Sequence, residues 1–227
     1  GCVINTVDFN QHTSGDPYTS VGSVCDRHIT KYFLDGSYGW TRVLTDDGPY
    51  EVNYTDERIF ISPINGDLYF VYTQHDATTD IDAGAGIQLR NRISSYGDTH
   101  ILRYTKGGVY VSDVRLQTAN YFMSVMAGSF DSSGDLLVSG QLSFPNSGPF
   151  DINYSPSNIL SYTARVESGT YSAAYIMKVN SDLTQEWIYP IDHQANYSTD
   201  LFYPFAIHSE GSSFTVAGRY RGVLDLD

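Results

Sequence analysis

Short runs of alternating apolar and polar residues cover most of the chain, and no long segment carries the period of an amphipathic helix. A period of two predicts strands with one buried face. The clearest runs are rich in β-branched and aromatic residues, and they cover residues 68–72, 136–140 and 214–218. Each follows a turn cluster that contains glycine, at 65–67, 133–135 and 210–212. The pattern therefore predicts an all-β chain.

Three further kinds of run recur in the same order around these strands. One apolar run precedes each turn cluster, at 58–61, 124–127 and 204–207. A second run alternates apolar and polar residues and has a cation at its fourth place, at 28–32, 100–104 and 175–179. The third holds an aromatic residue at a matching place, which is Trp40, Tyr110 or Trp187. Four strands per unit are therefore expected.

An Asp-apolar-Asp/Asn triplet marks the period of this pattern. Its copies begin at Asp8, Asp80, Asp151 and Asp225, so they lie 72, 71 and 74 residues apart. A period of this length indicates one supersecondary unit that is copied along the chain. We expect one domain over 1–227, with a partial first and last repeat: 1–56, 57–120, 121–200 and 201–227.

Four short antiparallel strands per repeat are typical of a β-propeller blade. We therefore expect about three repeats of about 72 residues, each forming a blade. Propellers have about four to eight blades, so the chain is expected to be a segment of a larger propeller, or one of two copies that complete a ring. The alternative is a β-sandwich, which has no reason to repeat one set of landmarks.

The best copy of the repeat combines four segments: the hairpin and strand at 130–140, the triplet at 150–153, the strand at 174–179 and the pair Glu186-Trp187. These segments resemble the blades of bacterial secreted β-propeller repeat proteins, often labelled SBBP repeats. The resemblance covers essentially the whole chain. It implies a propeller fold and an extracellular or cell-surface location. Its motifs are structural and imply no catalytic residue.

Composition and charge narrow the classes of partner. Hydrophobic residues make up 41% of the 227 residues, enough to build a globular core. The net charge is −13 and the pI about 4.6, so a nucleic-acid backbone would be repelled. No run approaches the roughly eighteen apolar residues of a membrane-spanning helix. Nineteen tyrosines and only three lysines suit an extracellular chain.

Two cysteines, Cys2 and Cys25, flank the hairpin that holds the first triplet. The strand that begins near residue 28 should run antiparallel to the strand around Cys2, which would bring the two cysteines near one another. A disulfide between them is one interpretation, and two buried free thiols are the other.

The triplets are the candidate metal site. Residues two apart in a strand share a face, and calcium favours several oxygen ligands. The candidate ligands are Asp80, Asp82, Asp151, Asn153, Asp225 and Asp227. The alternative is structural: the polar side chains end a strand and hydrogen-bond the next turn, and the central apolar residue is buried. No other cofactor is indicated.

The segments that follow two of the triplets are the candidate binding loops, because function in such folds usually lies on loops. They run from 83 to 96 and from 154 to 171, and they offer aromatic and cationic side chains. The candidate contact residues are Arg90, Arg92, Tyr96, Tyr154, Tyr162 and Tyr171. A different turn, with an Asp five residues before Trp40 or Trp187, is similar to the Asp-box turn of sialidase-type propellers and implies architecture.

The motifs of common enzymes are absent from the sequence: there is no Gly-x-Ser-x-Gly elbow, no phosphate-binding loop and no His-Glu-x-x-His. We therefore expect an extracellular or cell-surface module with a binding or structural role, which contacts protein or carbohydrate through its loops. The alternative is part of a polysaccharide-active hydrolase or lyase. Partners would include the rest of a longer chain or a second copy.

Overall fold

The fold is all-β. The computed structural model describes residues 2–3, 5–10, 17–20, 26–45, 57–84, 86–94, 97–116, 121–144, 150–154, 160–163, 171–191, 193–194, 202–220 and 223–224. These residues form strands and turns, with no helix among them. None of them therefore belongs to a helix long and apolar enough to cross a membrane.

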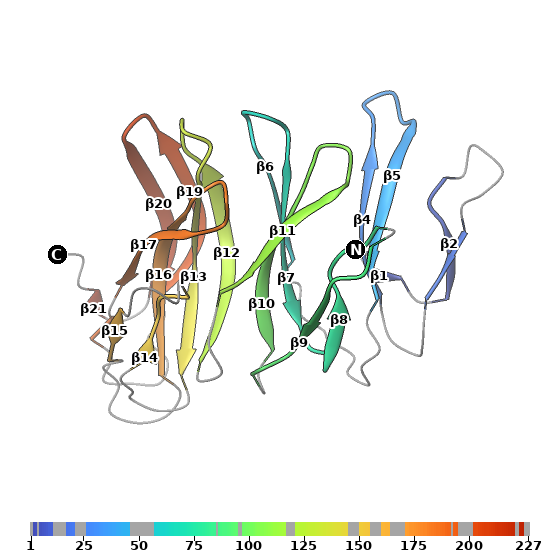
Figure 1. Cartoon of the computed structure of the whole chain (residues 1–227). Coiled ribbons are helices and arrows are strands. Elements are labelled where there is room, and N and C mark those ends of the chain that lie inside the picture. Colours follow the sequence, from blue (N-terminus) through green and yellow to red (C-terminus); the bar gives the residue numbers. More distant parts are fainter. Residues whose placement is uncertain are drawn as a thin grey trace.

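Two four-stranded antiparallel sheets form the centre of the molecule (Figure 1). The second sheet along the chain contains β6 (Arg58–Ile61), β7 (Leu68–Gln74), β10 (Asp98–Tyr104) and β11 (Tyr110–Arg115). The third contains β12 (Phe122–Phe130), β13 (Leu136–Phe144), β16 (Tyr171–Val179) and β17 (Gln185–Ile191). In both, the strands lie in chain order from one edge to the other. The four runs predicted for each repeat correspond to these strands.

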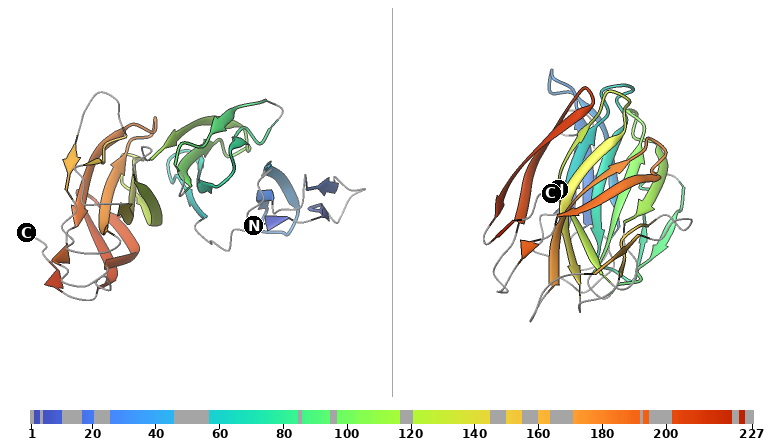
Figure 2. Two further views of the ribbon diagram at one scale, coloured as in Figure 1. Left: turned by 90° about the horizontal axis from the view of Figure 1, so that it is seen from below. Right: turned by 90° about the vertical axis from the view of Figure 1, so that its left-hand side faces the viewer.

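Smaller sheets flank this pair. The first sheet contains β1 (Cys2–Val3), β4 (Asp26–Tyr32) and β5 (Tyr38–Leu44). The fourth contains β19 (Phe202–Glu210) and β20 (Ser213–Tyr220). The strands that begin near Leu68, Leu136 and Phe214 lie in three different sheets. Figures 1 and 2 show the sheets following one another in chain order, without closing into a ring.

Two-stranded hairpins form at the first three triplets. They pair β2 (Thr6–Asp8) with β3 (Pro17–Thr19), β8 (Thr78–Asp80) with β9 (Leu89–Asn91), and β14 (Phe150–Asp151) with β15 (Ser161–Tyr162). Each lies between the second and third strands of its repeat. One further pair, β18 (His193–Gln194) with β21 (Val223–Leu224), joins residues assigned to the last two repeats.

The same β-bulge recurs in three sheets, in the pairs β4–β5, β10–β11 and β16–β17. The register shifts at Lys31/Tyr32, Arg103/Tyr104 and Lys178/Val179. The strand register corrects one expected match. Trp40 and Trp187 lie opposite the cations Lys31 and Lys178. The residue in the same place opposite Arg103 is Ser112. Tyr110 instead corresponds to Tyr38, opposite a tyrosine in both sheets.

The largest apolar core lies between the second and third sheets. Buried side chains of both sheets share one cluster, among them Tyr69, Ile101 and Val125. The approach is close where the ring of Phe60 covers Gly128, since a Cβ on that glycine would come 2.8 Å from the ring. Burial of this apolar surface holds neighbouring sheets together.

The cation in the third strand of each repeat has a structural partner in the two complete sheets. Arg103 Nη2 lies 2.7 Å from Asp67 Oδ2, and Lys178 Nζ lies 3.2 Å from Asp135 Oδ2. Both aspartates directly follow the glycine of a turn cluster. Arg103 also donates to the carbonyl of Ser181 in the third sheet at 2.6 Å. The recurring cation therefore joins the turn to the third strand.

Candidate binding site

The triplets end strands, and their first aspartates hold the turns that follow. Oδ1 of Asp8 accepts a hydrogen bond from the backbone N–H two residues later at 2.9 Å, and Asp80 and Asp151 do the same at 3.1 Å. The middle residues Phe9, Ile81 and Ile152 are buried. These contacts match the structural interpretation of the triplet. Asp225 and Asp227 lie outside the described residues.

A cavity of about 360 Å³ lies between the first sheet with its hairpin and the second triplet. The β2–β3 hairpin contributes Tyr18, and Phe9 follows β2. Tyr38 comes from β5, and the segment 80–84 closes the far side with Asp80 and Asp82. Pockets for small molecules typically measure about 300–1,000 Å³. The cavity therefore has the size of a small binding site.

The cavity wall combines aromatic rings with negative charge. Among the described residues that line it, the carboxylates are those of Asp80 and Asp82, and there is no Lys, Arg or His. Oδ1 of Asp80 also accepts from the N–H of Gln88 at 2.8 Å, and Oδ1 of Asp82 accepts from the N–H of Gly84 at 3.0 Å. The described residues donate no hydrogen bond to either Oδ2. One oxygen of each carboxylate thus fixes the loop, and Oδ2 of Asp82 lies beside Gly86 of the same loop.

The loop that carries these carboxylates is anchored to the second sheet. Tyr104 donates from its buried hydroxyl to the carbonyl of Ile81 at 2.8 Å. Burial raises the pKa of Tyr104, and the nearby charge of Asp82 raises it further, so this hydroxyl keeps its proton. The N–H of Ile81 donates to the carbonyl of Gln88 at 3.0 Å. The backbone N–H and the backbone carbonyl of Ile81 are therefore both hydrogen-bonded.

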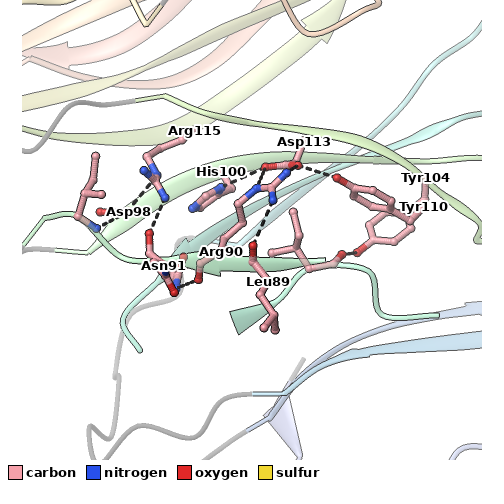
Figure 3. A network of polar contacts seen from close by, with 12 residues as sticks. Leu89, Arg90, Asn91, Asp98, His100, Tyr104, Tyr110, Asp113 and Arg115 are labelled. Atoms are coloured by element: carbon pink, nitrogen blue, oxygen red, sulfur yellow. Dashed lines mark hydrogen bonds and ion pairs between the residues drawn. The ribbon is translucent and has the colours of Figure 1, made fainter. Parts of the chain in front are cut away.

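A polar network holds the adjacent strand β9 (Figure 3). Arg90 binds the carboxylate of Asp113 with two nitrogens, at 2.9 Å and 2.6 Å, and Tyr110 donates to the same carboxylate at 2.6 Å. Nδ1 of the buried His100 lies 3.8 Å from it. Burial works to raise the pKa of Asp113, but His100, Arg90 and Tyr110 together hold it well below its ordinary value.

Further contacts fix both sides of β9. Arg115 donates to the carbonyl of Asn91 at 2.6 Å and pairs with the buried Asp98 at 3.1 Å. Gln74 donates to the carbonyl of Arg90 at 2.8 Å. Figure 3 shows Arg115 between Asp98 and Asn91. The hairpin next to the cavity is therefore held by charged hydrogen bonds.

Four of the loop residues predicted to contact a partner are described, and each contacts other residues of the chain. Arg90 binds Asp113, and Arg92 donates to the carbonyl of His75. Tyr154 donates to the carbonyl of Leu183 at 3.0 Å, and the ring of Tyr162 packs 5.7 Å from that of Phe144. These four side chains make intramolecular contacts. Tyr96 and the side chain of Tyr171 lie outside the described residues.

The remaining predicted sites can be placed only in part. Strand β1 pairs antiparallel with β4, as expected for the cysteine strand. The side chain of Cys2 and all of Cys25 lie outside the described residues, so the disulfide stays a prediction. Within the described part of the chain, no three His, Cys, Asp or Glu residues gather closely enough to hold a metal.

Sequence reasoning named Asp80 and Asp82 but missed the aromatic residues that face them. Tyr18 lies in the hairpin expected around the first triplet, and Tyr38 is marked in the sequence only by its place after a turn. A scan against models of known protein families and a search of curated proteins gave no match to this chain. The geometry of the cavity is therefore the basis for a functional assignment.

Proposed function

We propose that the chain forms consecutive blades of a β-propeller, two with four strands and two in part. Three features support this: the strand order shared by the two complete sheets, the recurring bulge, and the packing of each sheet on the next in chain order. In a propeller, blades pack in this succession around an axis. The rest of the ring would come from a longer chain or from a second copy.

We propose further that this module binds a protein partner and that the cavity takes a cationic side chain, lysine or arginine, of that partner. One observation carries the proposal: the rings of Phe9, Tyr18 and Tyr38 and the carboxylates of Asp80 and Asp82 line one cavity, and its described lining holds no Lys or Arg. Aromatic faces and carboxylates both attract cations, and the effect grows when water is excluded.

The remaining properties of the chain fit such a role. The net charge of −13 would steer a basic partner toward the module and speed its association. The tyrosine-rich, lysine-poor composition supports the proposed extracellular or cell-surface location. Calcium is a second candidate occupant because two carboxylates face the cavity, although the three rings suit an organic cation better.

The test uses blocked tripeptides, acetyl-Gly-X-Gly-amide, in which X is arginine, lysine or citrulline. Citrulline has the shape of arginine without its charge. Isothermal titration should show that the two cationic peptides bind and that the citrulline peptide binds about tenfold more weakly or not at all. Asp82→Asn keeps an oxygen for the Gly84 N–H and removes the charge, so it should weaken binding of the arginine peptide.

Glu210→Gln is the matched control because it changes the net charge equally at an exposed position outside the cavity. It should leave peptide binding unchanged. Equal binding of arginine and citrulline peptides, or equal effects of Asp82→Asn and Glu210→Gln, would refute the cation site. Chromatography coupled to light scattering would report separately on assembly into a ring.

A further inference from the structure

A second cavity, of about 500 Å³, lies between the third and fourth sheets, at the end where their hairpin turns lie. The β12–β13 turn forms one side and the β19–β20 turn the other. Trp187 of β17 and Lys178 of β16 complete the wall. This site shares no residue with the cavity around Asp80 and Asp82.

An aromatic pair lines this second cavity. The rings of Trp187 and Phe214 are stacked, with centroids 5.9 Å apart and planes inclined by 27°. Phe214 is 41% exposed, and the described residues offer no hydrogen-bond partner to Nε1 of Trp187. The pair thus provides apolar ring surface together with one polar N–H, a combination that suits amphipathic ligands.

Hydroxyl groups line the opposite side. Five serines come from the two turns: Ser132, Ser133, Ser209, Ser212 and Ser213. Only the hydroxyl of Ser213 has a partner among the described residues, the carbonyl of Glu210 at 3.0 Å. The other four hydroxyls can both donate to and accept from a ligand. Such groups match a ligand that itself carries several hydroxyls.

The charges at this cavity disfavour an anion. Among the described residues of the lining, Lys178 is the only cation, and its ammonium group is shared among Asp131 at 3.1 Å, Asp135 at 3.2 Å and Glu186 at 2.9 Å. Hydrogen bonding to Glu186, followed by the contacts to the two aspartates, raises the pKa of Lys178. The three carboxylates outnumber the one ammonium, so this cluster repels a phosphate or carboxylate.

We infer that the second cavity binds a neutral carbohydrate. A sugar ring has an apolar face that stacks on an aromatic side chain and hydroxyls that exchange hydrogen bonds with serines and carboxylates. The cavity offers the indole, the hydroxyls and the carboxylate oxygens together, and its negative excess excludes acidic sugars. This inference is independent of the cation site, because its evidence lies in different residues.

The probes are tetrasaccharides of β-1,4-linked glucose, mannose and xylose, with tetragalacturonate as the anionic counterpart. In a Trp40→Phe background Trp187 is the only tryptophan, so its fluorescence reports on the second cavity. At least one neutral probe should change this fluorescence saturably at millimolar concentration, and tetragalacturonate should not. Isothermal titration provides the affinity for variants that lack the indole.

Two variants test the site in different ways. Trp187→Ala removes the stacking surface and should weaken binding at least about tenfold. Ser212→Tyr fills the cavity from an exposed turn and leaves the aromatic pair intact, so it covers the case in which Trp187→Ala fails to fold. Asp82→Asn should leave sugar binding unchanged. The inference is overturned if no neutral probe binds, if tetragalacturonate binds as well, or if Ser212→Tyr binds like the wild type.

Discussion

The indole of Trp40 lies against Gly108 so closely that a Cβ on the glycine would come 2.7 Å from Cδ2 of the ring. Trp40 belongs to β5 of the first sheet, and Gly108 to the β10–β11 turn of the second. Trp40 Nε1 donates to the carbonyl of Lys106 at 3.3 Å, and Arg42 donates to the carbonyl of Gly108 at 2.5 Å. These contacts to one turn add to the apolar cluster that Ile29 and Leu44 of the first sheet form with β7 and β10 of the second.

Gly108→Ala should destabilise the protein for two reasons. Its φ of +77° is unfavourable for a residue with a Cβ, and the new methyl group would meet the indole. The backbone effect alone costs about 1–2 kcal/mol, and the overpacking adds about 1 kcal/mol or more. Urea unfolding followed by circular dichroism measures the sum.

Gly36→Ala is the matched control for this change. Gly36 holds the same place in the β4–β5 turn, with φ +84°, but nothing lies within 4 Å of its Cβ position. It should show the backbone effect of about 1–2 kcal/mol without the overpacking. If the free energy of unfolding falls equally in both variants, the contact of Gly108 with Trp40 adds no destabilisation of its own.

Leu183 holds the corresponding place in the β16–β17 turn with φ +70°, although it has a branched side chain. Its side chain is 3% exposed and belongs to the main core, which explains why the strained backbone is tolerated. Leu183→Ala should lower the free energy of unfolding by about 2–5 kcal/mol, because it leaves a cavity in the core and keeps the left-handed backbone. Leu183→Gly should be no less stable than Leu183→Ala.

That order reverses the usual one, in which glycine is less stable than alanine by about 0.5–1 kcal/mol. Relief of the left-handed backbone, about 1–2 kcal/mol, supplies the difference. Denaturant midpoints of the two variants, measured with equal slopes, decide the question. A clearly less stable Leu183→Gly would mean that the turn is not strained.

Asp113 should make the stability depend on acid pH. Its folded pKa is lowered, so the unfolded state binds its proton first as the pH falls, and stability present at neutral pH is lost on acidification. Asp113→Asn should be less stable than the wild type by about 1–3 kcal/mol at pH 7. This difference should begin to shrink as the pH falls below about 4, the ordinary pKa of an aspartate, because the unfolded wild type takes up a proton there while the folded carboxylate stays ionised.

Tyr110→Phe is the graded control for the pH experiment. It removes one hydrogen bond to Asp113 and leaves the two bonds from Arg90. Its stability loss should be smaller and should also decrease on acidification. A difference between Asp113→Asn and the wild type that stays constant down to pH 3 would exclude Asp113 as a source of the acid dependence.

Calcium binding at Asp80 and Asp82 is tested by thermal melts with added calcium and with a chelator. We expect equal melting temperatures, because one oxygen of each carboxylate already holds a turn N–H and calcium requires about six to eight oxygen ligands. The double variant Asp80→Asn, Asp82→Asn provides the reference. A calcium-dependent rise in the wild type that this variant abolishes would assign the metal to the triplet.

Strand identity was largely readable from sequence because alternation and β-branched residues act locally. The run 58–61 is β6 itself, and the runs near Leu68 and Leu136 fall in β7 and β13. The hairpin at the first triplet was expected, whereas the pairs β8–β9 and β14–β15 were not, because strands of two or three residues show no period. Tyr110 matched the tryptophans only in being aromatic; the pairing shows that Ser112, two residues later, holds their place.

The candidate sites depended on contacts that no local pattern encodes. Arg90 was a reasonable binding residue from its loop position, yet Asp113, 23 residues away, holds it. The cavity near Asp80 joins hairpin, strand and loop residues from two sheets. The second cavity likewise joins Trp187, Ser132 and Ser133 of the third sheet to three serines of the fourth.

The sequence by itself determined the all-β class and the period of about 72 residues, because side-chain alternation and turn residues specify strands one at a time. It also marked the aspartate that ends a strand in each triplet. Only the tertiary structure decided which turn each tryptophan or cation contacts, which carboxylates line a cavity, and where rings face hydroxyls. Those relationships arise between sheets, where residues about seventy positions apart are brought into contact by packing.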